Sequence, residues 1–81
     1  MRRVAVDSTS IASIGYDPHS RELDIEFLDS GDIYRFFDVS ETEHIEFLAA
    51  ESKGTYLNRI FKSREHRYIV VKKGGRVERT G

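Results

Sequence analysis

Two turn sequences cut the first half of the chain into short segments, and this spacing constrains the fold more than any other feature. Strand character is confined to three segments separated by turn chemistry: 10–16, 22–28 and 32–37, with 17–20 and 29–31 between them. Pro18 fixes one φ angle in the first turn, and Gly31 supplies the positive φ that a tight hairpin needs in the second. The pattern predicts a three-stranded antiparallel meander.

Apolar side chains set the expected register, because a slip of one residue would move a whole strand's side chains to the other face. A two-residue loop at Ser30 and Gly31 pairs Glu26 with Arg35 as a favourable cross-strand pair. The core face then consists of Ala12, Ile14, Leu23, Ile25, Phe27, Tyr34 and Phe36.

The opposite face of this meander is polar and mostly acidic. It consists of Ser13, Glu22, Asp24, Glu26 and Arg35. We expect this face to be solvated and to repel phosphate, which makes it a poor platform for nucleic acid.

A helix should follow the meander. Ser40 and Glu43 have the spacing of a capping box, in which each side chain bonds the backbone N–H of the other residue. This helix is expected to run to about Ala50 and to cover the sheet with one apolar stripe, formed by Ile45, Leu48 and Ala49.

A second, shorter helix is predicted from its cap at Ser52 through Phe61, with an apolar stripe formed by Leu57, Ile60 and Phe61.

Residues 68–71 read Tyr-Ile-Val-Val, which indicates either a fourth strand at a sheet edge or an exposed adhesive segment; we favour the strand. The fold class is therefore α+β, a three-stranded antiparallel meander with a fourth C-terminal strand if 68–71 pairs, packed by two short helices. The expected divisions are an N-terminal segment, a folded domain and a C-terminal strand or basic tail, at 1–9, 10–67 and 68–81.

Charge is segregated along the chain far more than the net charge of −1 suggests. Residues 1–51 carry four arginines against twelve carboxylates, a net charge of −8. Residues 52–81 carry nine basic residues against two glutamates, a net charge of +7. This asymmetry indicates a basic segment available to nucleic acid, to another anionic surface or to an acidic protein partner.

Several function classes are not expected. The 81 residues contain no Cys and no apolar stretch near the roughly 20 residues that span a bilayer. His19, His44 and His66 are far apart in sequence, so neither a metal cluster nor a His-based catalytic pair is indicated. We therefore expect a soluble, cytoplasmic, single-domain protein that is not an enzyme, takes no cofactor or metal, and does not bind membranes.

Three stretches, 11–17, 33–37 and 52–60, together resemble the KTSC family of short bacterial domains. Such domains occur at the C-terminus of some lysine tRNA synthetases and as stand-alone proteins, and the resemblance spans about residues 10–67. The family's Tyr-x-Tyr motif appears here as Tyr34-Arg35-Phe36, which lacks the second hydroxyl. The attachment to a synthetase implies RNA binding.

The start of the second helix is the most interesting candidate site. Free backbone N–H groups, hydroxyls and Lys53 would converge there on an anion, with Gly54 allowing close approach; the alternative is that Ser52 only caps the helix and Gly54 makes a tight bend. Basic residues follow, with Tyr56 and Tyr68 interleaved as candidate stacking partners. The candidate nucleic-acid-binding residues are Ser52, Lys53, Gly54, Tyr56, Asn58, Arg59, Lys62, Arg64 and Arg67.

Tyr34 and Phe36 have the i, i+2 spacing by which RNA-binding sheets present aromatic rings to bases. The predicted register buries both under the first helix, so core packing is favoured for them. The leading hypothesis is a small non-catalytic nucleic-acid-binding module, with RNA favoured over DNA. The alternative is a protein–protein interaction module that uses its acidic and basic surfaces and can self-associate.

Overall fold

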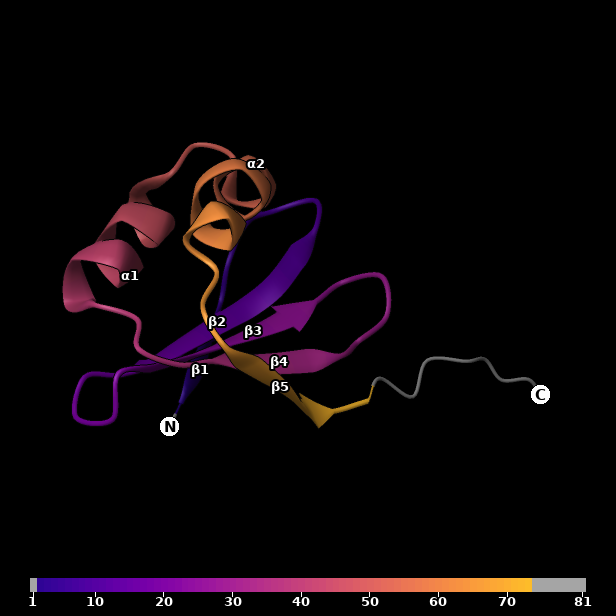
Figure 1. The fold of residues 1–81 in the computed structure, drawn as a ribbon. Helices are drawn as coiled ribbons and strands as arrows, with labels where there is room; N and C mark the ends of the chain where they lie inside the picture. The colour runs from indigo at the N-terminus through magenta and orange to yellow at the C-terminus, as the bar shows by residue number, and fades with distance from the viewer. Residues whose placement is uncertain (1, 74–81) are drawn as a thin grey trace.

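The computed structural model describes residues 2–73, so the expected basic tail after Lys73 lies outside the described residues. Its centre is one antiparallel sheet whose strands follow the chain order β1-β2-β3-β4-β5 (Figure 1). The strands are β1 (Arg3–Ala5), β2 (Ile11–Asp17), β3 (Glu22–Phe27), β4 (Ile33–Phe36) and β5 (Tyr68–Lys72).

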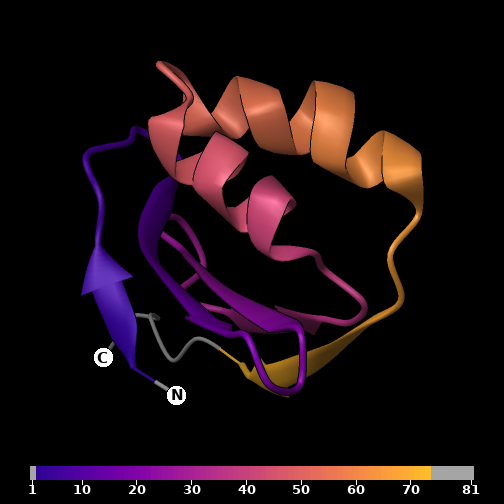
Figure 2. The same cartoon turned by 90° about the vertical axis from the view of Figure 1, so that its left-hand side faces the viewer.

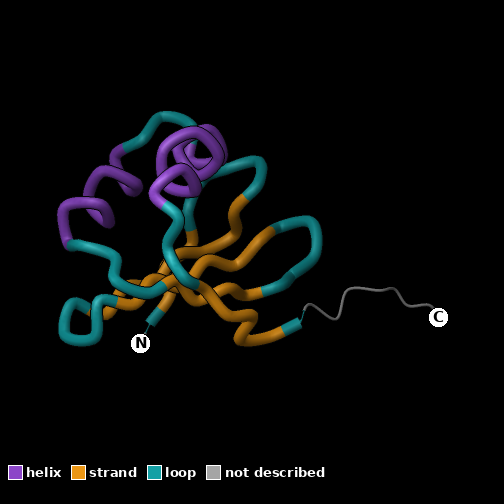
Figure 3. Tube along the Cα trace, in the orientation of Figure 1, coloured by secondary structure: helices purple, strands orange, loops and turns teal. Residues whose placement is uncertain are grey.

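The helical segments all lie on one face of this sheet (Figures 2 and 3). They are α1 (Glu41–Ala49), α2 (Lys53–Tyr56), the π-helical turn η1 (Leu57–Phe61) and the 3₁₀ turn η2 (Lys62–Arg64). The α+β class and the antiparallel sheet are therefore confirmed, with five strands in place of the expected three or four.

The additional strands come from the two ends of the chain. β5 confirms the favoured reading of residues 68–71, and it pairs with β4. β1 lies inside the expected N-terminal segment and pairs with β2, where Gly15 sits opposite Arg3. A Cβ atom at Gly15 would lie 2.9 Å from the carbonyl oxygen of Arg2, so this approach of the two strands requires a glycine. A three-residue strand carries too little alternation to be found by pattern.

The predicted register of β3 and β4 is wrong by two residues. Asp24, not Glu26, lies opposite Arg35. The backbone N–H of Phe27 donates to Asp32 O at 3.0 Å, so the hairpin closes around a four-residue loop and not a two-residue one. Because the error is an even number of residues, each side chain still points to the predicted face.

A β-bulge changes one predicted core position in β2. The pairing with β3 shifts between Ile11 and Ser13. Ile11 is fully buried in the core, whereas Ala12, which was expected there, is only half-buried. The extra residue of the bulge sends the larger side chain inward.

The capping box that begins α1 is confirmed. Ser40 N–H donates to Glu43 Oε1 at 2.9 Å, and Glu43 N–H donates to Ser40 Oγ at 3.1 Å. The predicted apolar stripe is wrong, since Ile45 is 60% exposed and Phe47 is completely buried. Phe47 packs on Tyr56, with ring centroids 5.2 Å apart.

The residues that face the core are instead His44 and Phe47 of α1 and Ala50, which caps the helix. His44 stacks on Tyr16 with ring centroids 4.5 Å apart, and Ala50 packs against the core. Burial lowers the pKa of His44, so its neutral ring can act as an aromatic core residue. Because His44 is polar, the inward-facing positions of α1 do not form an apolar pattern in the sequence.

The second helix is interrupted by its π turn. Tyr56, Leu57 and Phe61 are buried, as predicted for the last two, but Ile60 is exposed. A π turn takes more residues per turn than an α-helix, so it brings residues 57 and 61 to the inward side and turns Ile60 toward solvent.

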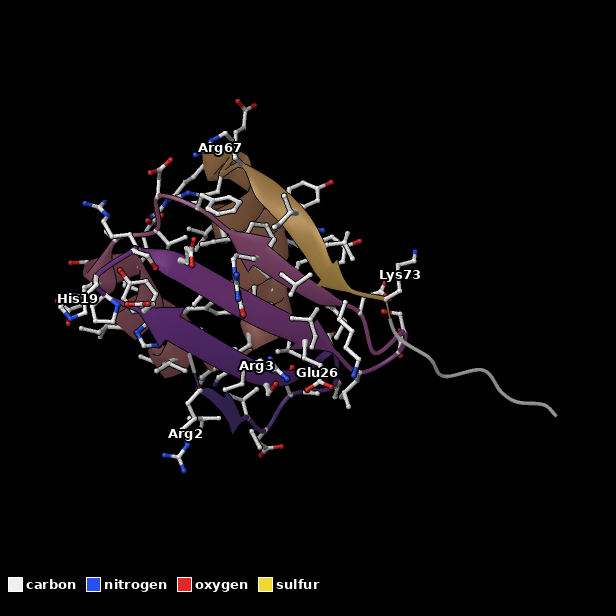
Figure 4. All side chains as sticks on the ribbon, turned by 90° about the horizontal axis from the view of Figure 1, so that it is seen from below. Arg2, Arg3, His19, Glu26, Arg67 and Lys73 are labelled. Carbon is white, nitrogen blue, oxygen red and sulfur yellow. The ribbon has the colours of Figure 1, made fainter. Side chains whose placement is uncertain are left out.

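Among residues 2–73, no helix stands in front of the opposite sheet face, which Figure 4 shows from below. The expectation that this whole face is solvated is wrong for Ser13, which is buried, and for Asp24, which is 3% exposed. Arg35 donates two hydrogen bonds to it, from Nε at 2.8 Å and from Nη2 at 3.0 Å. The bidentate pair satisfies the buried carboxylate and covers it with the arginine side chain.

The Glu43 carboxylate ties the helical layer to the sheet. Besides its bond to Ser40, it accepts hydrogen bonds through Oε2 from Arg64 Nη1 at 2.8 Å and from His66 Nε2 at 2.9 Å. The other ring nitrogen of His66 lies 2.9 Å from the carbonyl oxygen of Phe37, just after β4. Burial acts to raise the pKa of Glu43, but its bonds to Ser40, Arg64 and His66 lower the pKa from 4.5 to about 2.

This carboxylate should control acid stability. The folded pKa lies below the ordinary value, so its stabilisation is present above about pH 4.5 and is lost as pH falls toward 2. Glu43→Gln should lower the free energy of unfolding at neutral pH by about 1–3 kcal/mol and flatten its dependence on pH in the acid range. Urea denaturation at neutral and acid pH measures both effects.

Glu41→Gln is the matched control, because Glu41 is also in the first turn of α1 but is exposed. It should change the free energy of unfolding by less than about 0.5 kcal/mol. Parallel acid profiles for wild type and Glu43→Gln would contradict the assignment.

Candidate nucleic-acid interface

A cavity of about 650 Å³ opens between the helix-covered face of the sheet, the β3–β4 hairpin and the end of the helical segment. Its aromatic lining comes from strands and from η1, whereas its charged lining comes from the hairpin loop and from residues 62–66. The lining residues are Ser10, Phe27, Asp29, Ser30, Asp32, Tyr34, Phe36, Phe61, Lys62, Glu65, His66 and Tyr68.

The floor of the cavity is a layer of three aromatic rings. Ring centroids lie 5.4 Å apart for Tyr34 and Tyr68, 5.5 Å for Phe36 and Tyr68, and 6.3 Å for Tyr34 and Phe36. These distances form a triangle, so the rings lie beside one another and not in a single column. Their planes differ by 24° to 39°.

Two further rings stand as walls at the edges of this floor. Phe27 meets Tyr34 edge-on, at 82° and 5.4 Å between centroids. Phe61 meets Phe36 in the same way, at 84° and 5.0 Å. The floor and walls together form a surface suited to a flat, unsaturated ring.

The sheet register gathers these rings. Tyr34 and Phe36 share a face of β4 by the two-residue period, and Phe36 lies directly opposite Tyr68 of β5. Core packing is the favoured prediction for both β4 rings. Phe36 is buried as predicted, whereas Tyr34 is only half-buried. Phe36 is covered by Phe61 of η1 and not by α1 as expected.

Exposure shows which part of the floor a ligand can reach. The Tyr68 side chain is 56% exposed, the largest exposure among the three floor rings. Within residues 2–73, neither the Tyr34 nor the Tyr68 hydroxyl has a hydrogen-bond partner. A ligand could therefore stack on these rings and bond their hydroxyls without displacing a protein contact.

The rim of the cavity carries both signs of charge. Asp29 and Asp32 lie on the hairpin side, and Lys62, Glu65 and His66 lie on the helical side. His66 is already engaged with Glu43, whereas Lys62 makes no ion pair with any residue between 2 and 73. A cation is thus available at one side of a mostly acidic rim.

At the start of α2, where an anion site is predicted, the polar groups make capping and packing contacts within the protein. Ser52 Oγ accepts from Thr55 N at 3.3 Å, and Lys53 Nζ donates to Ala50 O at 3.2 Å. A Cβ at Gly54 would lie 3.0 Å from Ser10 Oγ, so the glycine serves close packing. The adjoining concavity of about 230 Å³ is lined by Asp7 and Glu51 as well as by these residues, which disfavours an anion.

Three other predicted residues have partners within the chain. Tyr56, a candidate stacking residue, is buried and donates its hydroxyl to Glu46 at 3.0 Å. Burial and then the Glu46 carboxylate raise the pKa of Tyr56. Arg64 bonds Glu43, and Arg67 lies 3.5 Å from Asp38. Such pairing weakens the predicted basic patch.

The remaining predicted residues, Asn58, Arg59 and Lys62, are exposed on η1 and η2. Arg59 and Lys62 have no acidic partner within the described part of the chain. Of the nine predicted residues only Lys62 lines the cavity. Phe27 and Asp32 were not predicted as cavity residues, and Tyr68 was predicted only as a stacking partner within the basic run. The strand predicted at 68–71 was the signal that could have placed Tyr68 beside the β4 rings.

Residues 2–73 contain no group of three or more His, Cys, Asp or Glu side chains placed to hold a metal ion. They also contain no helix that is both long and apolar enough to cross a membrane.

A family model and a solved structure name the same family. The chain is 41% identical over 68 residues to an uncharacterised protein of Stutzerimonas stutzeri, covering 84% of this chain and 94% of that one. It is 37% identical over 59 residues to a protein of Tsukamurella paurometabola, covering 73% and 87%. The crystal structure of a KTSC domain protein from Yersinia pestis superposes with a TM-score of 0.81 at 35% identity, covering 88% and 97%. The model of the KTSC domain matches residues 7–66, and this chain belongs to the KTSC domain family.

Proposed function

We propose that this protein is a non-catalytic module that binds single-stranded nucleic acid, RNA in preference to DNA, in the aromatic cavity. The observation that carries the proposal is the floor of half-buried Tyr34 and exposed Tyr68, beside Lys62, which has no ion-pair partner among residues 2–73. Bases would stack on the floor, and the backbone would follow the helical side of the cavity.

Base stacking supplies sequence-tolerant affinity. Each base stacked on an aromatic side chain contributes about 1–3 kcal/mol, because every base has a π face. A volume of about 650 Å³ is within the range of ordinary ligand sites. The cavity therefore has room for a base and part of its ribose.

The phosphate contacts would come from a small number of cations. Arg59 and Lys62 are exposed along the helical side, Lys72 ends β5, and Lys73 follows it. Few contacts and an acidic rim imply weak, salt-dependent binding, with Kd in the range of about 10⁻⁴ to 10⁻⁶ M.

The preference for RNA rests on hydroxyl chemistry. Ser10, Ser30 and the carboxylates that line the cavity can bond a ribose 2′-hydroxyl, which DNA lacks. A role in RNA binding would place the protein in the cytoplasm. It needs no cofactor, since stacking and phosphate contacts are binding functions.

Removing the Tyr68 ring should weaken binding. Tyr68→Ala should raise the Kd for a labelled single-stranded RNA by about 5- to 100-fold, the equivalent of one lost stacking partner. Tyr68→Phe keeps the ring and should bind within about threefold of wild type. Fluorescence anisotropy measures both, with circular dichroism as a check on folding. Unchanged affinity in the alanine variant would refute the stacking floor.

Reversing charge on the helical side should abolish binding. The double variant Arg59→Glu, Lys62→Glu places two negative charges where the proposal puts phosphate. The neutral Lys62→Gln should lower the slope of log K against log salt by about 0.7, as expected for one lost phosphate contact to a single strand. Arg67→Glu is the control, because Arg67 pairs with Asp38 and lies outside the cavity. Retained binding in the double variant would refute the assigned backbone path.

A second candidate, self-association, is favoured by the exposure of β5. All five residues of this edge strand are exposed, including the apolar run from Tyr68 to Val71. An exposed apolar edge strand can pair with a strand of another chain. This differs from the expected attraction between acidic and basic surfaces, since Arg64 and Arg67 already have acidic partners within the chain.

Salt should distinguish the two modes of association. A dimer joined through β5 would persist in light scattering from about 50 mM to 1 M salt, whereas a dimer held by surface charge would dissociate as salt rises. Val70→Lys should break only the first kind, because it adds charge to the paired edge. A monomer at every salt concentration would remove this candidate.

A further inference from the structure

The half-buried carboxylate of Asp32 gives the cavity a means to distinguish bases, an inference that rests on the proposed function. Asp32 lines the cavity at the hairpin end. Its backbone is held on both sides: Phe27 N–H donates to Asp32 O at 3.0 Å, and Asp32 N–H donates to Ser30 Oγ at 3.1 Å. The carboxylate thus projects from a fixed point.

Asp32 and Tyr34 are two residues apart where the chain enters β4, so they share the cavity side. A rise of about 3.3 Å per residue puts their Cα atoms about 6–7 Å apart. That separation is close to the width of a base. A base stacked on Tyr34 would therefore turn one of its edges toward the Asp32 carboxylate.

The chemistry of that edge decides which bases fit. An ionised carboxylate only accepts hydrogen bonds, and it offers about four acceptor positions, so a contact within the protein is compatible with one to a ligand. Guanine presents two adjacent donors, N1–H and the exocyclic amino group. Uracil presents one N–H between two carbonyl oxygens, which the carboxylate repels. The unstacked bases of single strands expose these edges.

Two other charges of the rim act in the same direction. Asp29 is a second carboxylate on the hairpin side, and Lys62 lies across the cavity on the helical side, where Glu65 also lies. Donor edges are attracted to the acidic side, and phosphates are kept to the side of Lys62. We infer that the cavity selects guanine over uracil in single-stranded RNA, with Asp32 as the residue that determines the preference.

The test is anisotropy with uridine oligonucleotides that differ only at one central position, which is G, A, C, U or inosine. Wild type should bind the guanosine oligonucleotide about tenfold more tightly than the all-uridine one. Inosine lacks the exocyclic amino group and should lose most of that gain, which tests the contact without changing the protein.

Asp32→Asn keeps the side-chain size and both main-chain hydrogen bonds, and it should bring the guanosine and uridine oligonucleotides within about twofold of each other. Asp29→Asn, in the exposed loop, should keep the preference. Equal binding of all oligonucleotides by wild type would overturn the inference and leave the proposed function standing. Absence of binding to every oligonucleotide would overturn both.

Discussion

The position of the helical layer depends on one carboxylate, that of Glu43. It joins the first turn of α1 to Arg64 at the end of η2 and to His66, and through His66 it reaches the carbonyl of Phe37 after β4. The aromatic wall of Phe61 and the cation of Lys62 both belong to the segment that Arg64 and His66 hold. The shape of the cavity is therefore set by hydrogen bonds that lie beside it, with the ring stack of Phe61 and His66 adding a further contact at 4.7 Å.

Charge that is segregated in the sequence is partly neutralised in the fold. The acidic residues of α1 and of the loop before it receive Arg64 and Arg67 from the basic half of the chain. On the helical side, Arg59 and Lys62 have no ion-pair partner among residues 2–73. A net charge of +7 over residues 52–81 thus overstates the basic surface, because chain segments of opposite sign fold onto each other. A binding partner inferred from charge alone therefore has to be checked against the ion pairs that form within the fold.

The features that sequence reasoning predicted well are those with strictly local causes. The capping box at Ser40 and the facing of the residues in β3 and β4 follow from neighbours within a few positions. Errors arose where a distant contact decided the outcome. The hairpin length depended on the Phe27–Asp32 closure and the inward face of α1 on His44 stacking with Tyr16. The aromatic cavity likewise depends on β5 returning to β4, since Tyr68 lines it only because residues about thirty positions earlier lie beside it.

The π turn at residues 57–61 lets the helical segment absorb a change of length. A π turn is equivalent to an α-helix with one inserted residue, so the loss of one residue between 57 and 60 would restore a regular helix. The parts of the segment on either side of the turn would then keep their faces, with Phe61 still directed inward and Lys62 still at the cavity. A length change of one residue at this turn is therefore compatible with an unchanged cavity lining, whereas the same deletion in a regular α-helix would rotate everything after it by about 100°.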